Sequence, residues 1–188
     1  MEVSALKLEG LVLLTPKKFI DDRGAFWETF RHGLLDEAAG QPIQFVQDNL
    51  SISKAGTLRG LHFQHAPHAQ GKLVRVAAGS ILDIAVDLRE SSATRGQWFR
   101  CVLSQENGSQ LWVPPGFAHG FLSLEDHTVV EYRCTAYYHP ESEGAVRWDD
   151  PDLNIDWSAE GFVMPETGPF VSKKDSSASS LSALDWPF

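Results

Sequence analysis

The sequence predicts an all-β fold, either a sandwich or a barrel. Apolar residues alternate with polar or small residues over many short segments, and the separators between these segments carry Gly, Pro, Asn or Ser. No regular alternation of strands with helices is visible, and no GxGxxG motif follows a strand, which disfavours a dinucleotide-binding fold. We therefore expect many short strands and few helices.

The clearest strand is 82–88, because Leu82, Ile84, Val86 and Leu88 alternate with smaller or acidic residues, as in a strand with one core face. A short helix is predicted around residues 33–39. The other predicted strands cover residues 43–49, 57–63, 72–77, 98–103, 110–113 and 128–135. From about Ser158 the pattern weakens, and residues 176–182 form either a linker or a weak final helix ending near Trp186.

Composition is that of one ordinary globular domain. With 188 residues, 43% apolar and 22% charged, the chain can bury about 70% of its unfolded surface without disulfides or a structural metal. Cys101 and Cys134 show no ligand spacing, and two thiols suit a reducing compartment. Because no signal peptide and no bilayer-spanning run is recognisable, we expect a cytoplasmic protein without a membrane partner.

The net charge of −9, from 16 basic and 25 acidic residues, argues against a nucleic-acid partner. An anionic ligand would need a few locally placed cations. Arg23 and Arg59 adjoin glycines, where the backbone can approach a ligand, and a guanidinium can donate two parallel hydrogen bonds to a diphosphate. The alternative for each arginine is ordinary surface charge.

His62 lies in a strand-like segment, where a neutral imidazole can act as a base near pH 7. The alternative is a hydrogen-bonded core histidine. Strict alternation would put Arg59 and His62 on opposite faces of the strand. A β-bulge at Gly60 would bring both side chains to the same side.

Tyr132 shares a strand face with Val130 and Cys134, so it is either a core aromatic residue or a proton donor. A phenol with a reference pKa of about 10 is protonated at neutral pH, as an acid must be. Lys72 opens a strand and is either a solvated strand end or a cation in a site. Asp83 either faces water or neutralises Lys72 inside a pocket.

A metal site is the competing interpretation, because jelly rolls of the cupin type often bind a metal through histidines. Here His62 is followed by Phe63 and Gln64, so the His-x-His pair of metal cupins is incomplete. His65 and His68 lie in a loop-like context that fixes no ligand geometry. We therefore expect no metal.

Seven segments, in this order and spacing, resemble the dTDP-4-dehydrorhamnose 3,5-epimerases. They are DDRGAFWETF, FVQDNLS, LRGLHFQ, QGKLVRVAAGSILDIAVDLR, LWVPPGFAHGFLSLED, YRCTAYYHPESEG and WDDPDLNIDW, and they extend from about Phe19 to Trp157. The resemblance implies a cupin-like, double-sheet jelly roll with a few short peripheral helices. It implies one domain over residues 1–188, with a core at about 10–157 and a C-terminal extension, 158–188, packing near the active site.

The resemblance implies a dTDP-4-keto-6-deoxyhexose as substrate and a role in dTDP-L-rhamnose biosynthesis. The C4 ketone acidifies the protons on C3 and C5, so one base and one acid can invert both centres through an enolate. No cofactor is expected for this reaction. Family members are homodimers that exchange strands, an arrangement that would also cover exposed sheet edges.

Four residues match the family's catalytic groups. His62 matches the base, Tyr132 the acid on the opposite face of the sugar, and Lys72 the cation beside the ketone oxygen. Asp175 looks like the carboxylate that orients the base. The poorer alternatives to Asp175 are Asp156 and Asp185.

The resemblance also implies a set of residues that bind the nucleotide sugar. Tyr138 matches the aromatic residue that stacks on the thymine ring. The others are Arg23, Glu28, Gln47, Asp48, Asn49, Arg59, Asp83, His119 and Glu143.

Two alternatives to the 3,5-epimerase remain open. A 5- or 3-mono-epimerase for another dTDP-deoxysugar would carry the same motifs, because the motifs do not report how many centres invert. A non-catalytic sugar-nucleotide binding module could keep the same fold. Retention of both His62 and Tyr132 favours catalysis, and it also disfavours a ketoisomerase of related fold.

Overall fold

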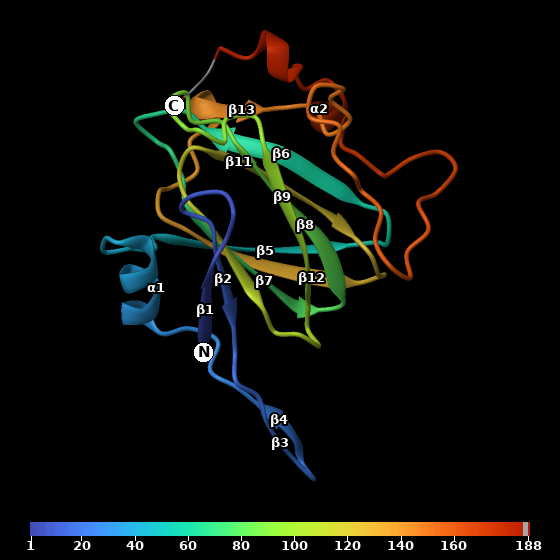
Figure 1. Cartoon of the computed structure of the whole chain (residues 1–188). Helices are drawn as coiled ribbons and strands as arrows, with labels where there is room; N and C mark the ends of the chain where they lie inside the picture. The colour runs from blue at the N-terminus through green and yellow to red at the C-terminus, as the bar shows by residue number, and fades with distance from the viewer. Residues whose placement is uncertain (186–187) are drawn as a thin grey trace.

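Two antiparallel sheets face each other in a double-sheet jelly roll (Figure 1). The computed structural model describes residues 1–185 and residue 188. The six-stranded sheet has the order β1 (Glu2–Ala5), β2 (Val12–Thr15), β10 (Gln110–Val113), β7 (Lys72–Ala78), β12 (Thr128–Cys134), β5 (Gln47–Ser53). The five-stranded sheet has the order β13 (Glu143–Ala145), β6 (Leu58–Gln64), β11 (Phe117–Ser123), β8 (Ser80–Asp87), β9 (Trp98–Ser104).

The remaining elements are short and lie around the two sheets. β3 and β4 form a separate hairpin that projects away from the body of the molecule (Figure 1). These elements are β3 (Phe19–Asp21), β4 (Gly24–Phe26), α1 (His32–Ala39), α2 (Lys173–Ser176) and the 3₁₀ helices η1 (Pro140–Ser142) and η2 (Leu181–Ala183). No helix in the described part of the chain is long and apolar enough to cross a membrane.

Three apolar layers hold the fold together, and each uses a different sheet face. Between the sheets, residues such as Val76, Phe121 and Val130 pack against one another. The outer face of the six-stranded sheet packs against α1, where Leu35 contacts the group that contains Trp112. The outer face of the five-stranded sheet packs under the C-terminal segment, whose buried members are Val146, Leu153, Trp157 and Leu181.

Strand β8 has two apolar faces, whereas the sequence predicted a strand with one core face. Leu82, Ile84 and Val86 face the C-terminal segment, whereas Ile81 and Ala85 face the space between the sheets. Strand β8 is therefore buried on both faces, and Asp83 is fully buried. Of the two alternatives for Asp83, exposure to water is therefore excluded, because the alternation showed one apolar face but not the segment that covers the other.

The predicted elements otherwise agree closely with the structure. The helix predicted at 33–39 is α1, and the strands predicted at 72–77, 98–103, 110–113 and 128–135 match β7, β9, β10 and β12 within one residue at each end. The strand predicted at 43–49 begins only at Gln47. Ile43 and Phe45 alternate as in a strand, but they pack beside Leu35 and Trp112 in the layer under α1. The suggested final helix ending near Trp186 falls partly outside the described residues.

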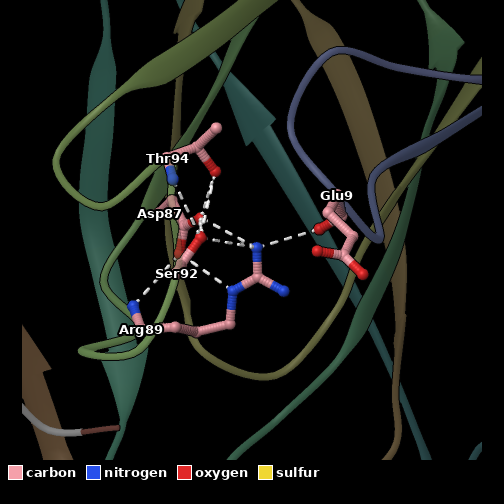
Figure 2. A network of polar contacts seen from close by, with 5 residues as sticks. All are labelled: Glu9, Asp87, Arg89, Ser92 and Thr94. Carbon is pink, nitrogen blue, oxygen red and sulfur yellow. Dashed lines mark hydrogen bonds and ion pairs between the residues drawn. The ribbon is translucent and has the colours of Figure 1, made fainter.

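A buried carboxylate fixes the loop after β8 (Figure 2). The side chain of Asp87 is fully buried and accepts hydrogen bonds from Arg89 Nε (2.9 Å), Ser92 Oγ (2.6 Å) and Thr94 Oγ1 (2.7 Å). Arg89 in turn donates to the carbonyl oxygen of Glu9 at 2.9 Å. Burial alone would raise the pKa of Asp87, but these hydrogen bonds outweigh it and lower the pKa to about 2.

We predict that Asp87→Asn lowers the free energy of unfolding at pH 7 by about 2 kcal/mol, the equivalent of the depressed pKa. Because the folded-state pKa of Asp87 lies below the unfolded value of 3.8, its contribution is complete above about pH 4. That contribution is lost as the pH falls from about 4 toward 2. Urea denaturation at several pH values measures both effects.

Asp149→Asn is the matched control, because Arg147 and Asp149 form the same kind of pair, two residues apart, with both side chains more than 40% exposed. Exposed pairs contribute less than about 1 kcal/mol. Equal losses of stability in the two variants would show that the Asp87 network does not stabilise the fold.

Candidate active site

Polar side chains from both sheets meet in the interior beside the apolar layer between them. Two adjoining pockets share His62, Lys72 and Tyr132. His62 comes from β6 in the five-stranded sheet, whereas Lys72 and Tyr132 come from β7 and β12 in the six-stranded sheet. The predicted base, acid and cation therefore line one site and belong to opposite sheets.

A β-bulge in β6 turns Arg59 and His62 into the same pocket. His119 of β11 is paired with His62, but Phe121 is paired with Arg59, so Gly60 and Leu61 together oppose a single residue of β11. Of the two pockets, the one that also contains His119 and Asp175 is lined by both Arg59 and His62. The bulge predicted at Gly60 is confirmed, and it brings together two side chains that strict alternation would have separated.

Only glycine fits at the bulge. Gly60 has a φ of 130°, which L side chains rarely adopt, and a Cβ added there would lie 2.5 Å from the Cα of Gly120. The neighbouring strand therefore approaches β6 so closely that no side chain can stand between them.

Asp175 is the carboxylate partner of His62 in this structure. His62 Nε2 lies 2.5 Å from Asp175 Oδ1, and their side chains are 28% and 5% exposed. Asp175 is in α2, which contacts β6, and its backbone N–H donates to the N-cap side chain of Ser172 at 3.0 Å. Burial raises the pKa of Asp175, but hydrogen bonds, first that from His62, outweigh it and lower the pKa below its ordinary value. Asp175 is therefore ionised at neutral pH.

Tyr132 faces this pair from the other sheet. β12 lies between β7 and β5, with Tyr132 opposite Val74 on one side and Asn49 on the other. Burial raises the pKa of Tyr132, with a smaller contribution from Cys134. The phenol is thus protonated at neutral pH and can donate a proton.

Lys72 places a cation close to His62. Its Nζ lies 3.5 Å from the carbonyl oxygen of His62. Burial lowers the pKa of Lys72, although nearby Cys134, Asp83 and Glu143 act in the opposite direction. A desolvated ammonium of this kind stabilises negative charge on a ligand oxygen more strongly than one in water.

Asp83 and His119 form a second buried pair at the same site. His119 Nε2 lies 2.8 Å from Asp83 Oδ1, and both side chains are less than 10% exposed. His119 also lines the pocket with Arg59. Asp83 thus holds the ring of His119 rather than pairing with Lys72 at hydrogen-bond distance.

The other pocket carries residues predicted to bind the nucleotide. Tyr138 donates its hydroxyl proton to Glu143 Oε2 at 2.7 Å, and its backbone N–H donates to Gln47 Oε1 at 2.9 Å. Gln47 Nε2 in turn donates to Asn49 Oδ1 at 3.0 Å. All four side chains line this pocket with His62 and Tyr132.

Three predicted binding residues lie elsewhere in the single chain. Asp48 points to the outer face of its sheet, 3.8 Å from Arg133, because neighbouring strand residues alternate in direction. Arg23 is bound to Asp21 at the tip of the β3–β4 hairpin. Glu28 pairs with Arg31 just before α1. Their assignments as ligand-binding residues remain predictions.

Sequence reasoning did not single out Lys174 and Gln64 as site residues. Lys174 forms an ion pair with Glu143, and Gln64 lines the pocket with it. The sequence carried a signal for each, since Lys174 precedes Asp175 and Gln64 follows His62 by two positions on the same strand face.

Residues 1–185 and 188 contain no group of three or more His, Cys, Asp or Glu side chains arranged to hold a metal ion. The arrangement instead offers a base with a buried carboxylate partner, a protonated phenol across the cavity and an ammonium beside them. Such a set can remove a proton from one side of a carbon acid and return one from the other side.

Comparisons with known proteins point to one family. The family model for dTDP-4-dehydrorhamnose 3,5-epimerase matches residues 5–183. A relative of that name from Methanothermobacter thermautotrophicus is 50% identical over 153 residues, which cover 81% of this chain and 82% of the relative.

Solved structures agree in fold over the whole chain. The dTDP-4-dehydrorhamnose 3,5-epimerase from Elizabethkingia anophelis superposes with a TM-score of 0.91 at 41% identity, covering 100% of this chain and 99% of that one. The dTDP-6-deoxy-D-glucose-3,5-epimerase from Legionella pneumophila, solved in complex with dTDP-4-keto-L-rhamnose, gives 0.89 at 43% identity, covering 98% and 94%.

We predict that Gly60→Ala lowers the free energy of unfolding by at least about 2 kcal/mol more than Gly24→Ala. Gly24 has nearly the same φ, 128°, but nothing lies within 4 Å of an added Cβ. The two variants therefore share the backbone strain, and only Gly60→Ala forces β11 away from β6. Urea denaturation measures the difference, and equal losses would show that the close approach at the bulge imposes no constraint.

Proposed function

The chain belongs to the dTDP-4-dehydrorhamnose 3,5-epimerase family and is an epimerase, and we propose that His62 and Tyr132 transfer the protons in its reaction. The substrate is a dTDP-4-keto-6-deoxyhexose, and the product serves dTDP-L-rhamnose biosynthesis. One observation carries the proposal. An imidazole with a buried carboxylate partner and a protonated phenol line the same pockets from opposite sheets.

The first step is proton abstraction by His62. Because Nε2 of His62 is hydrogen-bonded to ionised Asp175, Nε2 carries the hydrogen and Nδ1 holds the free lone pair. Nδ1 takes the proton from the carbon next to the ketone, and the electrons of the C–H bond move into the enolate. Asp175 stabilises the imidazolium that forms, as a buried carboxylate beside a base does.

Lys72 stabilises the enolate. Negative charge develops on the former ketone oxygen while the proton is on His62. An ammonium that is already desolvated in the pocket needs little reorganisation to stabilise that charge.

Tyr132 returns a proton on the other face of the ring. The phenol donates its proton to the enolate carbon, the C=C electrons form the new C–H bond, and the ketone is restored. The phenolate then regains a proton from solvent, and His62 loses its proton to solvent. Inversion follows because the leaving and arriving protons come from opposite sheets.

Arg59 and His119 are suited to the diphosphate. Both line the pocket that contains Asp175, and Asp83 holds the ring of His119 by a hydrogen bond. Tyr138, exposed beside Glu143, is suited to stacking on the thymine ring.

We propose that two copies of the chain form a homodimer. Phe19, Ile20 and Phe26 of the projecting hairpin are 56%, 78% and 72% exposed, and an isolated two-stranded hairpin is marginally stable in water. β5 is an edge strand with Leu50 and Ile52 exposed. A second copy would cover both surfaces, and the hairpin would carry Arg23 to the other copy.

We also propose a cytoplasmic location and a single domain. The free thiols of Cys101 and Cys134 suit a reducing compartment. The contact between Asp175 and His62 supports a C-terminal extension that works as part of the same domain, because it completes the site.

We predict that the wild-type protein, with dTDP-4-keto-6-deoxyglucose in deuterated water, introduces deuterium at both C3 and C5. His62→Ala should slow exchange at both carbons by about 10²- to 10⁴-fold, since it removes the base. Binding of dTDP should change less than about twofold, because dTDP lacks the sugar whose carbon His62 deprotonates. Mass spectrometry, NMR and calorimetry measure these quantities.

The pattern of label separates the alternatives. Label and inversion at C5 or C3 alone would identify a mono-epimerase. Tight dTDP binding without any exchange in the wild-type protein would identify a binding module and overturn the catalytic assignment.

We predict that Tyr132→Phe keeps the fold and allows exchange at the carbon that His62 deprotonates, while epimerised product forms at least about a hundredfold more slowly. Tyr137→Phe is the control, because Tyr137 is 70% exposed and outside the two pockets. Stereochemical analysis of the product measures the effect. Epimerisation by Tyr132→Phe at the wild-type rate would show that the phenol is not the donor.

A further inference from the structure

Two stacked imidazoles lie behind the turn that carries Tyr138. The rings of His68, in the loop after β6, and His139 have centroids 3.8 Å apart and planes within 5° of parallel. Nδ1 of each ring lies near the hydroxyl of Ser142, at 2.8 Å for His68 and 3.1 Å for His139. A single hydroxyl can accept a hydrogen bond from one neutral ring while it donates to the other.

This stack is directly connected to the nucleotide end of the pocket. His139 follows Tyr138 and Ser142 precedes Glu143, with η1 between them. Tyr138 bonds Glu143 across this turn, and His139 contacts Ser142 across the same turn. The two cross-turn contacts hold one short segment, so the contact to Ser142 contributes to the placement of Tyr138 and Glu143.

Gln64 ties the turn and the His68 loop to the strand of the base. Its side chain is buried, and Nε2 donates to the carbonyl oxygens of His68 (2.7 Å) and Tyr137 (3.2 Å). Its Oε1 accepts the backbone N–H of His139 at 2.7 Å. Gln64 thus joins both loops to β6, and the stacked rings of His68 and His139 add a second, direct contact between the two loops.

Resting on the proposed function of Tyr138, we propose that His68, His139 and Ser142 are positioning residues, a clamp that holds Tyr138 and Glu143 in place for the nucleotide. The clamp is closed when at most one imidazole carries a proton. When both rings are protonated, two like charges face each other at 3.8 Å, and the turn opens.

The surroundings leave this repulsion uncompensated. Among the residues that the structure describes, no carboxylate forms an ion pair with His68 or His139, and Glu143 is paired with Lys174 instead. The other ionisable groups in the two loops, η1 and β13 are His65, Tyr137, Tyr138, Glu141 and Glu143, and Lys174 of α2 is paired with Glu143.

The test compares the wild-type protein with His139→Asn. An asparagine keeps a polar atom near the position of Nδ1 but cannot be protonated. The probe is dTDP-glucose, whose diphosphate is esterified at both ends and does not titrate near neutral pH. His62 and His119 remain in both proteins, so their contribution to the binding of the probe is common to both.

Between pH 7.5 and 5.5, we expect the dissociation constant of dTDP-glucose to rise about threefold to sixfold more in the wild-type protein than in His139→Asn. This is the effect of forbidding double protonation of the stacked histidine pair in the bound state. At pH 7.5 the two proteins should bind with similar affinity. Parallel weakening of the two proteins on acidification would overturn the clamp.

Two further variants keep the outcomes distinct. Tyr138→Ala should weaken binding at both pH values, and undiminished binding by that variant would overturn the proposed function of Tyr138 rather than the clamp. Should His139→Asn fail to fold, His68→Asn removes the same charge pair from the other loop. The same comparison with wild type then decides.

Discussion

Burial of the outer face of the five-stranded sheet is the constraint on which the site depends. Val146, Leu153, Trp157 and Leu181 cover the apolar face that β8 and its neighbours present away from the interior. The same segment brings α2 into contact with β6, where Asp175 meets His62. Hydrophobic packing thus sets the position of a carboxylate, and the carboxylate sets the tautomer of the base.

The two sheets each contribute part of the site. The proposed base, His62, belongs to one sheet, and its partner Asp175 lies in α2, which contacts that sheet. The proposed acid, Tyr132, and the cation, Lys72, belong to the other sheet. Burial acts oppositely on the last two groups. It raises the pKa of Tyr132 and keeps the phenol protonated, and it lowers the pKa of Lys72, whose amine is poorly solvated in the pocket.

Most of the fold follows from local pattern, because period-two alternation and Gly-rich or Pro-rich separators are properties of short segments. The bulge at Gly60 was also predictable, since Arg59 and His62 can share a pocket only if one residue is added to the strand. The burial of Asp83 was not predictable in this way. It depends on a covering segment far along the chain, and alternation within β8 cannot reveal that both faces are covered.

The same limit applies to the site. Four of the predicted residues lie on strands, where alternation, together with the bulge in β6, determines which face each side chain occupies. These residues are His62, Lys72, Tyr132 and His119, and all of them line the pockets. Asp175 could be suggested only by resemblance, because no periodic pattern surrounds it. Asp48 shows the converse, since its neighbours Gln47 and Asn49 line the pocket while its own side chain must point to the other face.

The contact between His62 and Asp175 joins residues 113 positions apart. During synthesis at about 5–20 residues per second, the ribosome incorporates His62 roughly 6 to 23 seconds before Asp175. A half-made chain therefore has the histidine without the group that orients it. The contact forms only when the C-terminal segment packs against β6.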